Sequence, residues 1–215
     1  MGKKIAIYGF GGFGREVKSL IEDINTNKEQ YEFIGFFDDN PEIKNTINNY
    51  TILGGIKELN AWNDEISIAV AIGDPITKKS IVQKINNPKV SFPNLIHPSV
   101  IGNPNNYTIG HGCIICANNI LTVDITIGNF LILNLACTIG HDTLIKDFCS
   151  IMPGVNVSGE VELGACSYIG TGAKIINLVH IGKNTIVGAG AVVSKSLPEN
   201  CTAVGIPAKP IKFSK

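Results

Sequence analysis

Hydrophobic residues recur at every sixth position along the second half of the chain. A helical period of 3.6 residues drifts around the axis when it is sampled in steps of six, and glycine and β-branched residues disfavour helix. The residue that follows many of these anchors is glycine, and the position four after each anchor is mostly small or β-branched. The pattern therefore predicts short strands joined by turns. The anchors are all isoleucine, leucine or valine: Ile109, Ile115, Leu121, Ile127, Leu133, Ile139, Ile145, Ile151, Val157, Leu163, Ile169, Ile175, Ile181, Val187 and Val193.

The first ninety or so residues follow a different pattern, in which apolar runs alternate with helical periods. Apolar runs at residues 4–9, 31–39 and 66–73 predict buried strands, and amphipathic stretches after the first and the third predict helices. This order implies a small parallel sheet with right-handed crossovers, as in a Rossmann-like α/β domain. Prolines in residues 86–96 interrupt both patterns. We therefore expect one domain over residues 1–92 and the repeat domain with its C-terminal tail over residues 93–215.

Charge and hydropathy exclude several classes of partner. Eighteen acidic residues balance eighteen basic ones, so no global field is expected to attract nucleic acid or an anionic membrane. The apolar stretch at the start is too short for a secretory signal, and no later run is long enough to span a membrane. We therefore expect a cytoplasmic protein with no nucleic-acid or membrane partner, which must bind any anionic ligand at a local site.

The chain contains six cysteines and four histidines, which raises the question of a metal or redox site. Cys113 and Cys116 have C-x-x-C spacing, but no second pair completes a zinc site. Cys113, Cys137 and Cys149 instead fall on the small position of the repeat, where a thiol packs as a compact apolar group. The histidine spacings also do not suit a three-histidine metal site like that of the β-helix carbonic anhydrases. We expect no metal and, in the cytoplasm, no disulfide.

A glycine-rich turn follows the first predicted strand. Gly9, Gly11 and Gly14 fit a G-x-G-x-x-G motif between a strand and a helix, where backbone N–H groups can approach a phosphate. Asp38 and Asp39 end the second strand, where a dinucleotide enzyme places its ribose-binding acid. An NAD-dependent oxidoreductase is therefore one alternative, although so short a domain suits a mononucleotide better. In a purely structural alternative, the glycines make a tight turn and the aspartates cap the next segment.

The repeat resembles the hexapeptide repeat of left-handed β-helix acyltransferases, in which three hexads form one triangular coil and the coils stack. Over residues 96–198 this implies about five coils, and a step of eighteen residues stacks Asp124, Asp142 and Glu160. Six markers in order extend the resemblance over nearly the whole chain: IYGFGGFGREV, FFDD, AIGD, LIHPSV, the His141–Asp142 pair and the ending VGIPAK. Together they are similar to the bacterial nucleotide-aminosugar N-acetyltransferases and the related sialic acid O-acetyltransferases.

The resemblance implies an activity. Acetyl-CoA would donate an acetyl group to the amine of a nucleotide-linked 4-amino-4,6-dideoxysugar, by direct attack, for a surface glycan. His141 is implied as the general base with Asp142 orienting its ring, and an imidazole suits this role because it can accept a proton near neutral pH. Sugar O-acetylation of the sialic acid type is the alternative within the fold. A non-catalytic sugar-nucleotide binding protein is an alternative outside it.

The resemblance also implies two binding sites. The nucleotide sugar would contact Gly11, Gly12, Phe13, Asp38, Asp39 and Gly73. Acetyl-CoA would contact Ser150, Thr171 and Ala189 in a groove between neighbouring β-helices, which implies a homotrimer with active sites between subunits. Phe13 and Ser150 stand where some relatives have histidine, which leaves one acceptor contact and one thioester contact open. The nucleobase, among uracil, guanine and thymine, is also left open.

Overall fold

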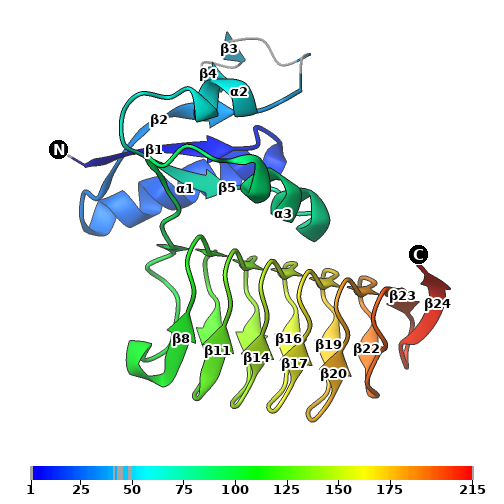
Figure 1. Ribbon diagram of the computed structural model, residues 1–215. Coiled ribbons are helices and arrows are strands. Elements are labelled where there is room, and N and C mark those ends of the chain that lie inside the picture. The colour runs from blue at the N-terminus through cyan, green and yellow to red at the C-terminus, as the bar shows by residue number, and fades with distance from the viewer. Residues whose placement is uncertain (1, 41, 43–45, 48–49, 215) are drawn as a thin grey trace.

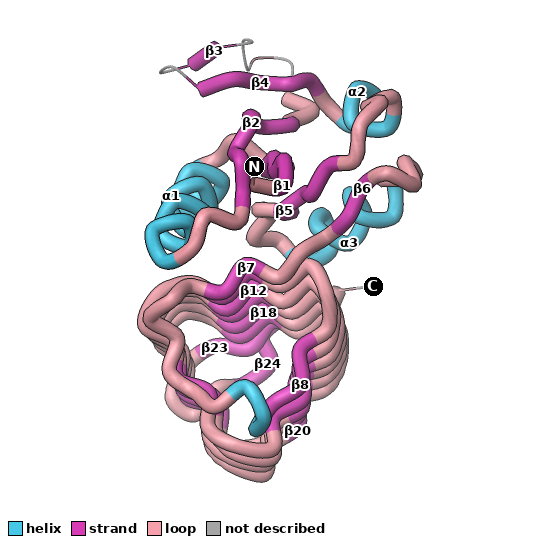
Figure 2. The backbone as a smooth tube through the Cα atoms, turned by 90° about the vertical axis from the view of Figure 1, so that its left-hand side faces the viewer, coloured by secondary structure: helices cyan, strands magenta, loops and turns pink. Residues whose placement is uncertain are grey.

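The computed structural model describes residues 2–40, 42, 46–47 and 50–214, and it consists of an α/β domain on top of a triangular prism of short strands (Figures 1 and 2). The two parts meet along one face of the prism, and the C-terminus lies at the far end of that prism (Figure 1). No helix within the described residues is long and apolar enough to cross a membrane.

The α/β domain contains a mixed sheet with strand order β3-β4-β2-β1-β5-β6, in which only the β3–β4 pair is antiparallel. The predicted three strands and two helices are confirmed, whereas β4 and α2 were not predicted because their short, partly buried sequences have no clear period. The elements are β1 (Lys3–Tyr8), α1 (Gly12–Asn27), β2 (Tyr31–Phe37), β3 (Thr46–Ile47), β4 (Tyr50–Gly54), α2 (Ile56–Asn60), β5 (Ile66–Val70), α3 (Pro75–Lys84) and β6 (Val90–Ser91).

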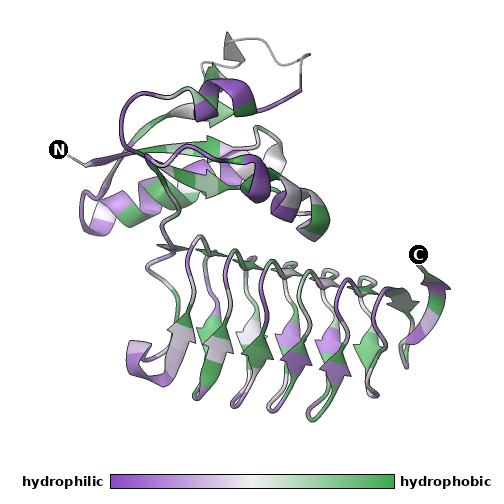
Figure 3. Ribbon diagram, in the orientation of Figure 1, coloured by the Kyte–Doolittle hydropathy of each residue, from purple (hydrophilic) through white to green (hydrophobic). Residues whose placement is uncertain are grey.

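Helix α1 packs tightly against the turn that follows β1. Its apolar and polar residues alternate with helical period (Figure 3), and it buries Val17, Ile21 and Ile24. A Cβ atom added to Gly14 would lie 1.9 Å from the carbonyl oxygen of Gly9, so only glycine lets the helix come this close. Gly14 is therefore required by packing between the helix and the turn.

The second half of the chain forms the prism by repeating one coil of three strands. From β8 to β19 each strand pairs in parallel with the strand eighteen residues further on, as Ile132 does with Ser150, so the predicted three hexads per coil are confirmed. The elements are β7 (Leu95–Ile96), η1 (Pro104–Asn106), β8 (Tyr107–Ile109), β9 (Ile114–Ile115), β10 (Ile120–Leu121), β11 (Ile125–Ile127), β12 (Ile132–Leu133), β13 (Thr138–Ile139), β14 (Leu144–Ile145), β15 (Ser150–Ile151), β16 (Asn156–Val157), β17 (Glu162–Leu163), β18 (Tyr168–Ile169), β19 (Lys174–Ile175), β20 (His180–Ile181), β21 (Ile186–Val187), β22 (Val192–Val193), β23 (Cys201–Val204) and β24 (Lys209–Phe213).

Three sheets form the faces of the prism. The docking face, which carries the α/β domain, has strand order β24-β23-β21-β18-β15-β12-β9-β7, where β23 and β24 form an antiparallel hairpin. The second face is β10-β13-β16-β19-β22, and the third is β20-β17-β14-β11-β8. The chain passes from docking face to second to third face in every coil, so the turns between the faces form three edges that run along the prism.

The anchors of the hexad form the core of the prism. From Ile115 to Val193 they are at most 2% exposed, and Ile109 is partly buried at the first coil. Cys113, Cys137 and Cys149 lie in the same core with fully buried side chains, so the packing role predicted for them is confirmed. Burial raises the pKa of Cys113 to about 11, which keeps this thiol protonated at neutral pH.

Each edge of the prism contains one residue per coil in the left-handed backbone conformation. Along the edge between the second and third faces these residues are Asp124, Asp142, Glu160 and Leu178, with φ between 55° and 63°. A side chain other than glycine costs about 1–2 kcal/mol in this conformation, and asparagine and aspartate tolerate it best. Asp124 and Asp142, two of the three acidic residues that the eighteen-residue step stacks on consecutive coils, therefore also suit the turn itself.

Apolar contacts and one buried lysine join the two parts of the molecule. Leu20 and Ile24 of α1 share a buried cluster with Leu95, Ile114 and Ile132 of the docking face. Further along this face, Lys78 of α3 is only 1% exposed. Its Nζ atom donates to the carbonyl oxygen of Cys149 at 3.1 Å and to Oγ of Ser150 at 3.0 Å, and burial lowers the pKa of Lys78 to about 7.

Candidate active site

His141 lies on the edge between the second and third faces, which we call the His141 edge. Its Nδ1 atom is 2.8 Å from Oδ2 of Asp142, and the two side chains are 55% and 58% exposed. An aspartate at Nδ1 accepts a hydrogen bond from the ring N–H and keeps that proton on Nδ1, which leaves the lone pair on Nε2 free to accept a proton. The pair therefore presents a base on the surface of the prism.

Gly159 supports the imidazole from the next coil. A Cβ atom added to Gly159 would lie 2.4 Å from Nε2 and 2.5 Å from Cε1 of His141. The φ angle of Gly159 is not in the left-handed range, so space and not backbone conformation requires glycine here. This contact was not predicted, although the eighteen-residue step leads directly from residue 141 to residue 159.

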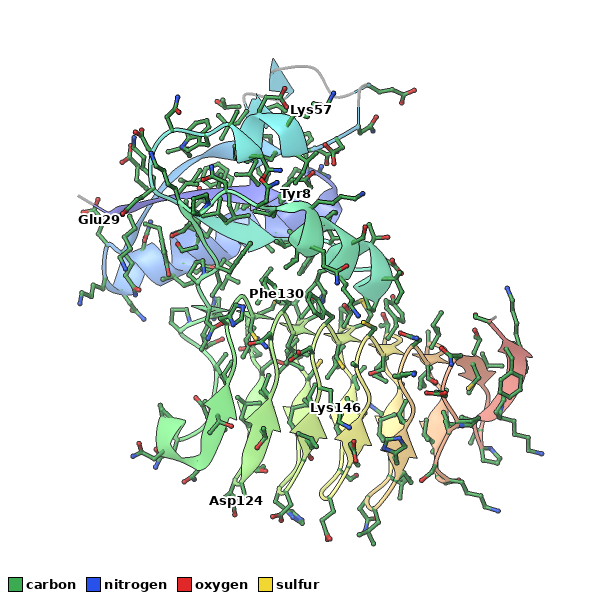
Figure 4. All side chains as sticks on the ribbon, in the orientation of Figure 1. Tyr8, Glu29, Lys57, Asp124, Phe130 and Lys146 are labelled. Atoms are coloured by element: carbon green, nitrogen blue, oxygen red, sulfur yellow. The ribbon has the colours of Figure 1, made fainter. Side chains whose placement is uncertain are left out.

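The His141 edge is the edge of the prism that lies opposite the docking face. It joins the second and third faces, whereas the α/β domain covers the docking face (Figure 2). Figure 4 shows Asp124, which belongs to the same edge one coil before Asp142, at the side of the prism that points away from Tyr8 in the α/β domain. One chain therefore does not bring His141 together with the residues of its own glycine-rich turn.

Asp38 and Asp39 hold the glycine-rich turn and α2 in place. Asp38 accepts hydrogen bonds from the backbone N–H of Phe10 at 2.8 Å and of Asn40 at 2.9 Å. Asp39 accepts from the N–H of Ile56 at the start of α2 at 2.8 Å and from the hydroxyl of Tyr8. Burial and this carboxylate raise the pKa of Tyr8. The structural alternative, in which an aspartate caps the next segment, thus describes Asp39.

Both aspartates also line a cleft of about 530 Å³ at the carboxyl ends of β1, β2 and β5. Parallel α/β sheets bind ligands at this end, where the connections leave in opposite directions. Ile72 and helix α3 complete the cleft, and α3 adds polar side chains. These side chains were not predicted, because a helical period alone does not show which face of the helix meets a ligand. Its lining residues are Tyr8, Asp38, Asp39, Ile72, Ile76, Thr77, Ser80, Ile81 and Lys84.

The predicted glycines divide into packed and open positions. A Cβ atom added to Gly11, Gly12 or Gly73 would meet no atom within 4 Å, which leaves room for a ligand next to the backbone. Phe13 is half-buried against the core of the α/β domain. Gly11, Gly12 and Phe13 lie at the start of α1, where free N–H groups favour an anion.

The residues predicted to contact acetyl-CoA separate in the structure. Thr171 and Ala189 are exposed on consecutive coils of the edge between the docking face and the second face, which we call the Thr171 edge. Gly172 and Gly190, which follow them, have open space around them. Ser150 does not fit the prediction, because its side chain is fully buried under α3 and hydrogen-bonded to Lys78.

The other three histidines have structural contacts. His97 accepts from Ser99 and lies 3.3 Å from Asp23 of α1, His111 packs edge-on against Phe130, and His180 lies 3.5 Å from a carboxylate of the third face. Within residues 2–40, 42, 46–47 and 50–214, no group of three histidine, cysteine, aspartate or glutamate side chains could hold a metal ion.

Known proteins match both parts of the chain. A family model described as "PglD N-terminal domain" matches residues 4–85. GDP-perosamine N-acetyltransferase of Escherichia coli O157:H7 is 29% identical over 97% of this chain and 96% of its own length. The acetyltransferase domain of PglB from Neisseria gonorrhoeae FA1090, solved with acetyl coenzyme A, superimposes with a TM-score of 0.87 at 29% identity over 98% of this chain and 100% of that one. WeeI from Acinetobacter baumannii AYE superimposes with a TM-score of 0.85 at 30% identity, over 97% and 100% of the two chains.

Other curated relatives match less than half of this chain. The chain spans 38% of the serine acetyltransferase of Synechococcus elongatus and 42% of a putative acetyltransferase of Schizosaccharomyces pombe. The fold and the exposed His141–Asp142 pair thus define an acyltransferase of the left-handed β-helix class with an N-terminal α/β domain. Within that class, the chain belongs to the bacterial nucleotide-aminosugar N-acetyltransferases, a family of acetyl-CoA-dependent enzymes.

Proposed function

We propose that this protein transfers an acetyl group from acetyl-CoA to the amine of a nucleotide-linked 4-amino-4,6-dideoxysugar, a building block of a surface glycan. The observation that carries the proposal is the exposed His141–Asp142 pair, whose Nδ1–Oδ2 distance is 2.8 Å. The full-length similarity to a GDP-perosamine N-acetyltransferase supports an amine acceptor on a nucleotide sugar.

In the proposed mechanism, the acceptor amine attacks the thioester carbonyl carbon directly. The new C–N bond forms as Nε2 of His141 takes a proton from the nitrogen, and the C–S bond breaks to release the coenzyme thiolate. The His141 imidazolium then gives that proton to the thiolate, which leaves as the thiol, so His141 returns to its neutral form and no covalent enzyme intermediate forms. Asp142 keeps the proton of the neutral ring on Nδ1 and stabilises the imidazolium that forms.

The nucleotide is proposed to bind at the cleft of the α/β domain, with its phosphates at the start of α1. Gly11, Gly12 and Gly73 leave open space there, and N–H groups at a helix N-terminus bind phosphate well. Asp38 and Asp39 offer carboxylate oxygens to hydroxyl or ring N–H donors, because each oxygen has lone pairs beyond the hydrogen bonds it already accepts.

Active sites between subunits are the natural consequence of this proposal, because His141 and the nucleotide cleft lie on opposite sides of one chain. A homotrimer would place the His141 edge of one copy beside the Thr171 edge and the α/β domain of the next, which is a closed heterologous arrangement. Acetyl-CoA would then lie between two prisms, near Thr171 and Ala189. We expect sedimentation equilibrium to give the mass of three chains.

The decisive experiment is the release of thiol from acetyl-CoA with a panel of nucleotide-linked aminosugars, and with nucleotide sugars that lack the amine as controls. We expect His141→Ala to lower kcat at least a hundredfold, the usual contribution of a general base, while the nucleotide still binds in calorimetry. Asp142→Asn is the matched variant, because asparagine keeps the left-handed turn, and its loss should be smaller.

Three results would overturn the proposal. Full activity of the His141→Ala variant would exclude the mechanism. Thiol release with hydroxyl acceptors but with no amine would assign O-acetylation instead. If nucleotide binds but no thiol is released with any acceptor, the chain is a binding protein or has the oxidoreductase chemistry that its glycine-rich turn also allows.

A further inference from the structure

Leu178 combines a left-handed backbone with an exposed apolar side chain, and both are unfavourable for leucine. Its φ angle is +63°, in the left-handed region where a bulky side chain crowds the backbone. Its side chain is nevertheless 67% exposed. A strained residue that persists without burial points to a role in binding.

Among the described residues in this conformation, Leu178 is the only large apolar side chain that is exposed, whereas the exposed Glu160 on the same edge carries a carboxylate that water solvates. Phe130 is also left-handed, but it is only 4% exposed and stacks on Phe148 with ring centroids 5.1 Å apart. Asn118 and Asn184 occupy left-handed positions on the other two edges, where asparagine is well tolerated. The turn thus demands the conformation, but it does not demand leucine.

The position of Leu178 relates it to His141. It stands two coils beyond Asp142 on the His141 edge, and Gly159 occupies the coil between them. Nε2 of His141 lies over Gly159, so the free lone pair of the imidazole is on the side of the ring that faces Leu178. Ile176, two residues earlier on the same turn, is also 40% exposed.

We propose that Leu178, together with Ile176, forms an apolar wall that binds the part of the acyl donor next to the thioester, on the side of the imidazole where Nε2 of His141 lies. This inference rests on the proposed function. Leu178 and Thr171 lie on the same coil, on the two edges that border the second face. A donor that runs along the prism from His141 toward the C-terminus therefore passes the coil that contains both residues. The methylene groups next to a thioester offer the apolar surface that such a wall contacts.

The test is Leu178→Asn, which removes the apolar surface and suits the left-handed turn better. We expect the KM for acetyl-CoA to rise about tenfold, the usual effect of losing a few apolar contacts. The kcat at saturating acetyl-CoA and the KM for the nucleotide sugar should change less than about twofold. The Tm should stay equal or rise, which separates this role from a purely structural one.

Val123→Asn is the matched control. Val123 is an apolar residue of the same edge and is 38% exposed, but it lies one coil on the other side of His141. This variant should leave the KM for acetyl-CoA unchanged. An equal rise in both variants would show a general effect of edge polarity and would overturn the assignment.

Two further measurements keep the inference separate from the proposed function. Calorimetric binding of free coenzyme A, on a His141→Ala background, should weaken about tenfold with Leu178→Asn even if catalysis follows another mechanism. Unchanged binding and unchanged KM would overturn the role of Leu178. If the variant instead sediments as single chains while the wild type does not, Leu178 contacts a second copy and the wall for the acyl donor is excluded.

Discussion

The α/β domain and the prism fix their functional groups by different means. In the α/β domain, each aspartate of the cleft is held by N–H groups from distant segments, such as Phe10 and Ile56. In the prism, His141 is held by its neighbour Asp142 and by Gly159 on the next coil. A change in the cleft must therefore disturb several elements, whereas a change on the edge acts on one turn. The aspartates of the cleft therefore also stabilise the fold, whereas His141 can be replaced with little effect on it.

The largest effect is expected where the α/β domain is most tightly packed. Gly14→Ala should lower the free energy of unfolding by about 3 kcal/mol, because overpacking next to backbone forces a local shift and the new Cβ atom would lie 1.9 Å from the carbonyl oxygen of Gly9. Gly11→Ala is the control in the same turn, with open space around it, and should change stability by less than about 0.5 kcal/mol. Urea unfolding measures both, and similar losses in the two variants would contradict this view of the turn.

The junction of the two regions should respond to pH through Lys78. Its pKa is about 7 in the folded protein and about 10.4 for an unfolded lysine. Between these values the unfolded chain holds a proton that the native state has released, so stability rises with pH. We expect a gain of about 2 kcal/mol from pH 7 to pH 9, and little further change from this group below about pH 6, where both states are protonated.

Lys78→Met should remove this gain, because it deletes the titrating group while it keeps a side chain of similar length. Lys79→Met is the control, since Lys79 is exposed on the same helix and should leave the pH dependence as it is. Urea unfolding at pH 7, 8 and 9 measures the slope. The same slope in Lys78→Met and in the wild type would assign the pH dependence to another group.

The smallest of the three effects is expected at the His141 edge and should be purely kinetic. Gly159→Ala displaces the imidazole, so kcat should fall about tenfold, as expected for a base moved from its productive position. The Tm should change little, because Gly159 does not need a left-handed backbone. Ser158→Ala, at the preceding residue, serves as the control. A loss of Tm with unchanged kcat would mean that Gly159 serves the fold and not the base.

The same contrast explains what the sequence could predict. The hexad predicts the prism, its core cysteines and its eighteen-residue register, because every coil places the same kinds of side chain at the same inward positions. The register even leads from His141 to Gly159. Strand β4 and helix α2 have no repeated pattern, and they form because the rest of the α/β domain gives them a surface to pack against.

The candidate site divides in the same way. The His141–Asp142 pair follows from adjacent residues, and the glycine-rich turn follows from its spacing. Lys78 could not be predicted, because a lysine on a helix is normally exposed and only the docked domain buries it. That burial also explains the error for Ser150, whose strand position is right but whose side chain lies under α3.

The eighteen-residue register also fixes the spacing of equivalent positions along each edge of the prism. Neighbouring strands lie about 4.8 Å apart, so the distance along the prism from His141 to an equivalent position on the same edge is a whole number of such steps. Relatives can therefore lengthen or shorten the reach between base and C-terminal hairpin only by inserting or deleting entire coils. An insertion of six or twelve residues would keep the anchors in the core but would shift every later residue to another face of the prism.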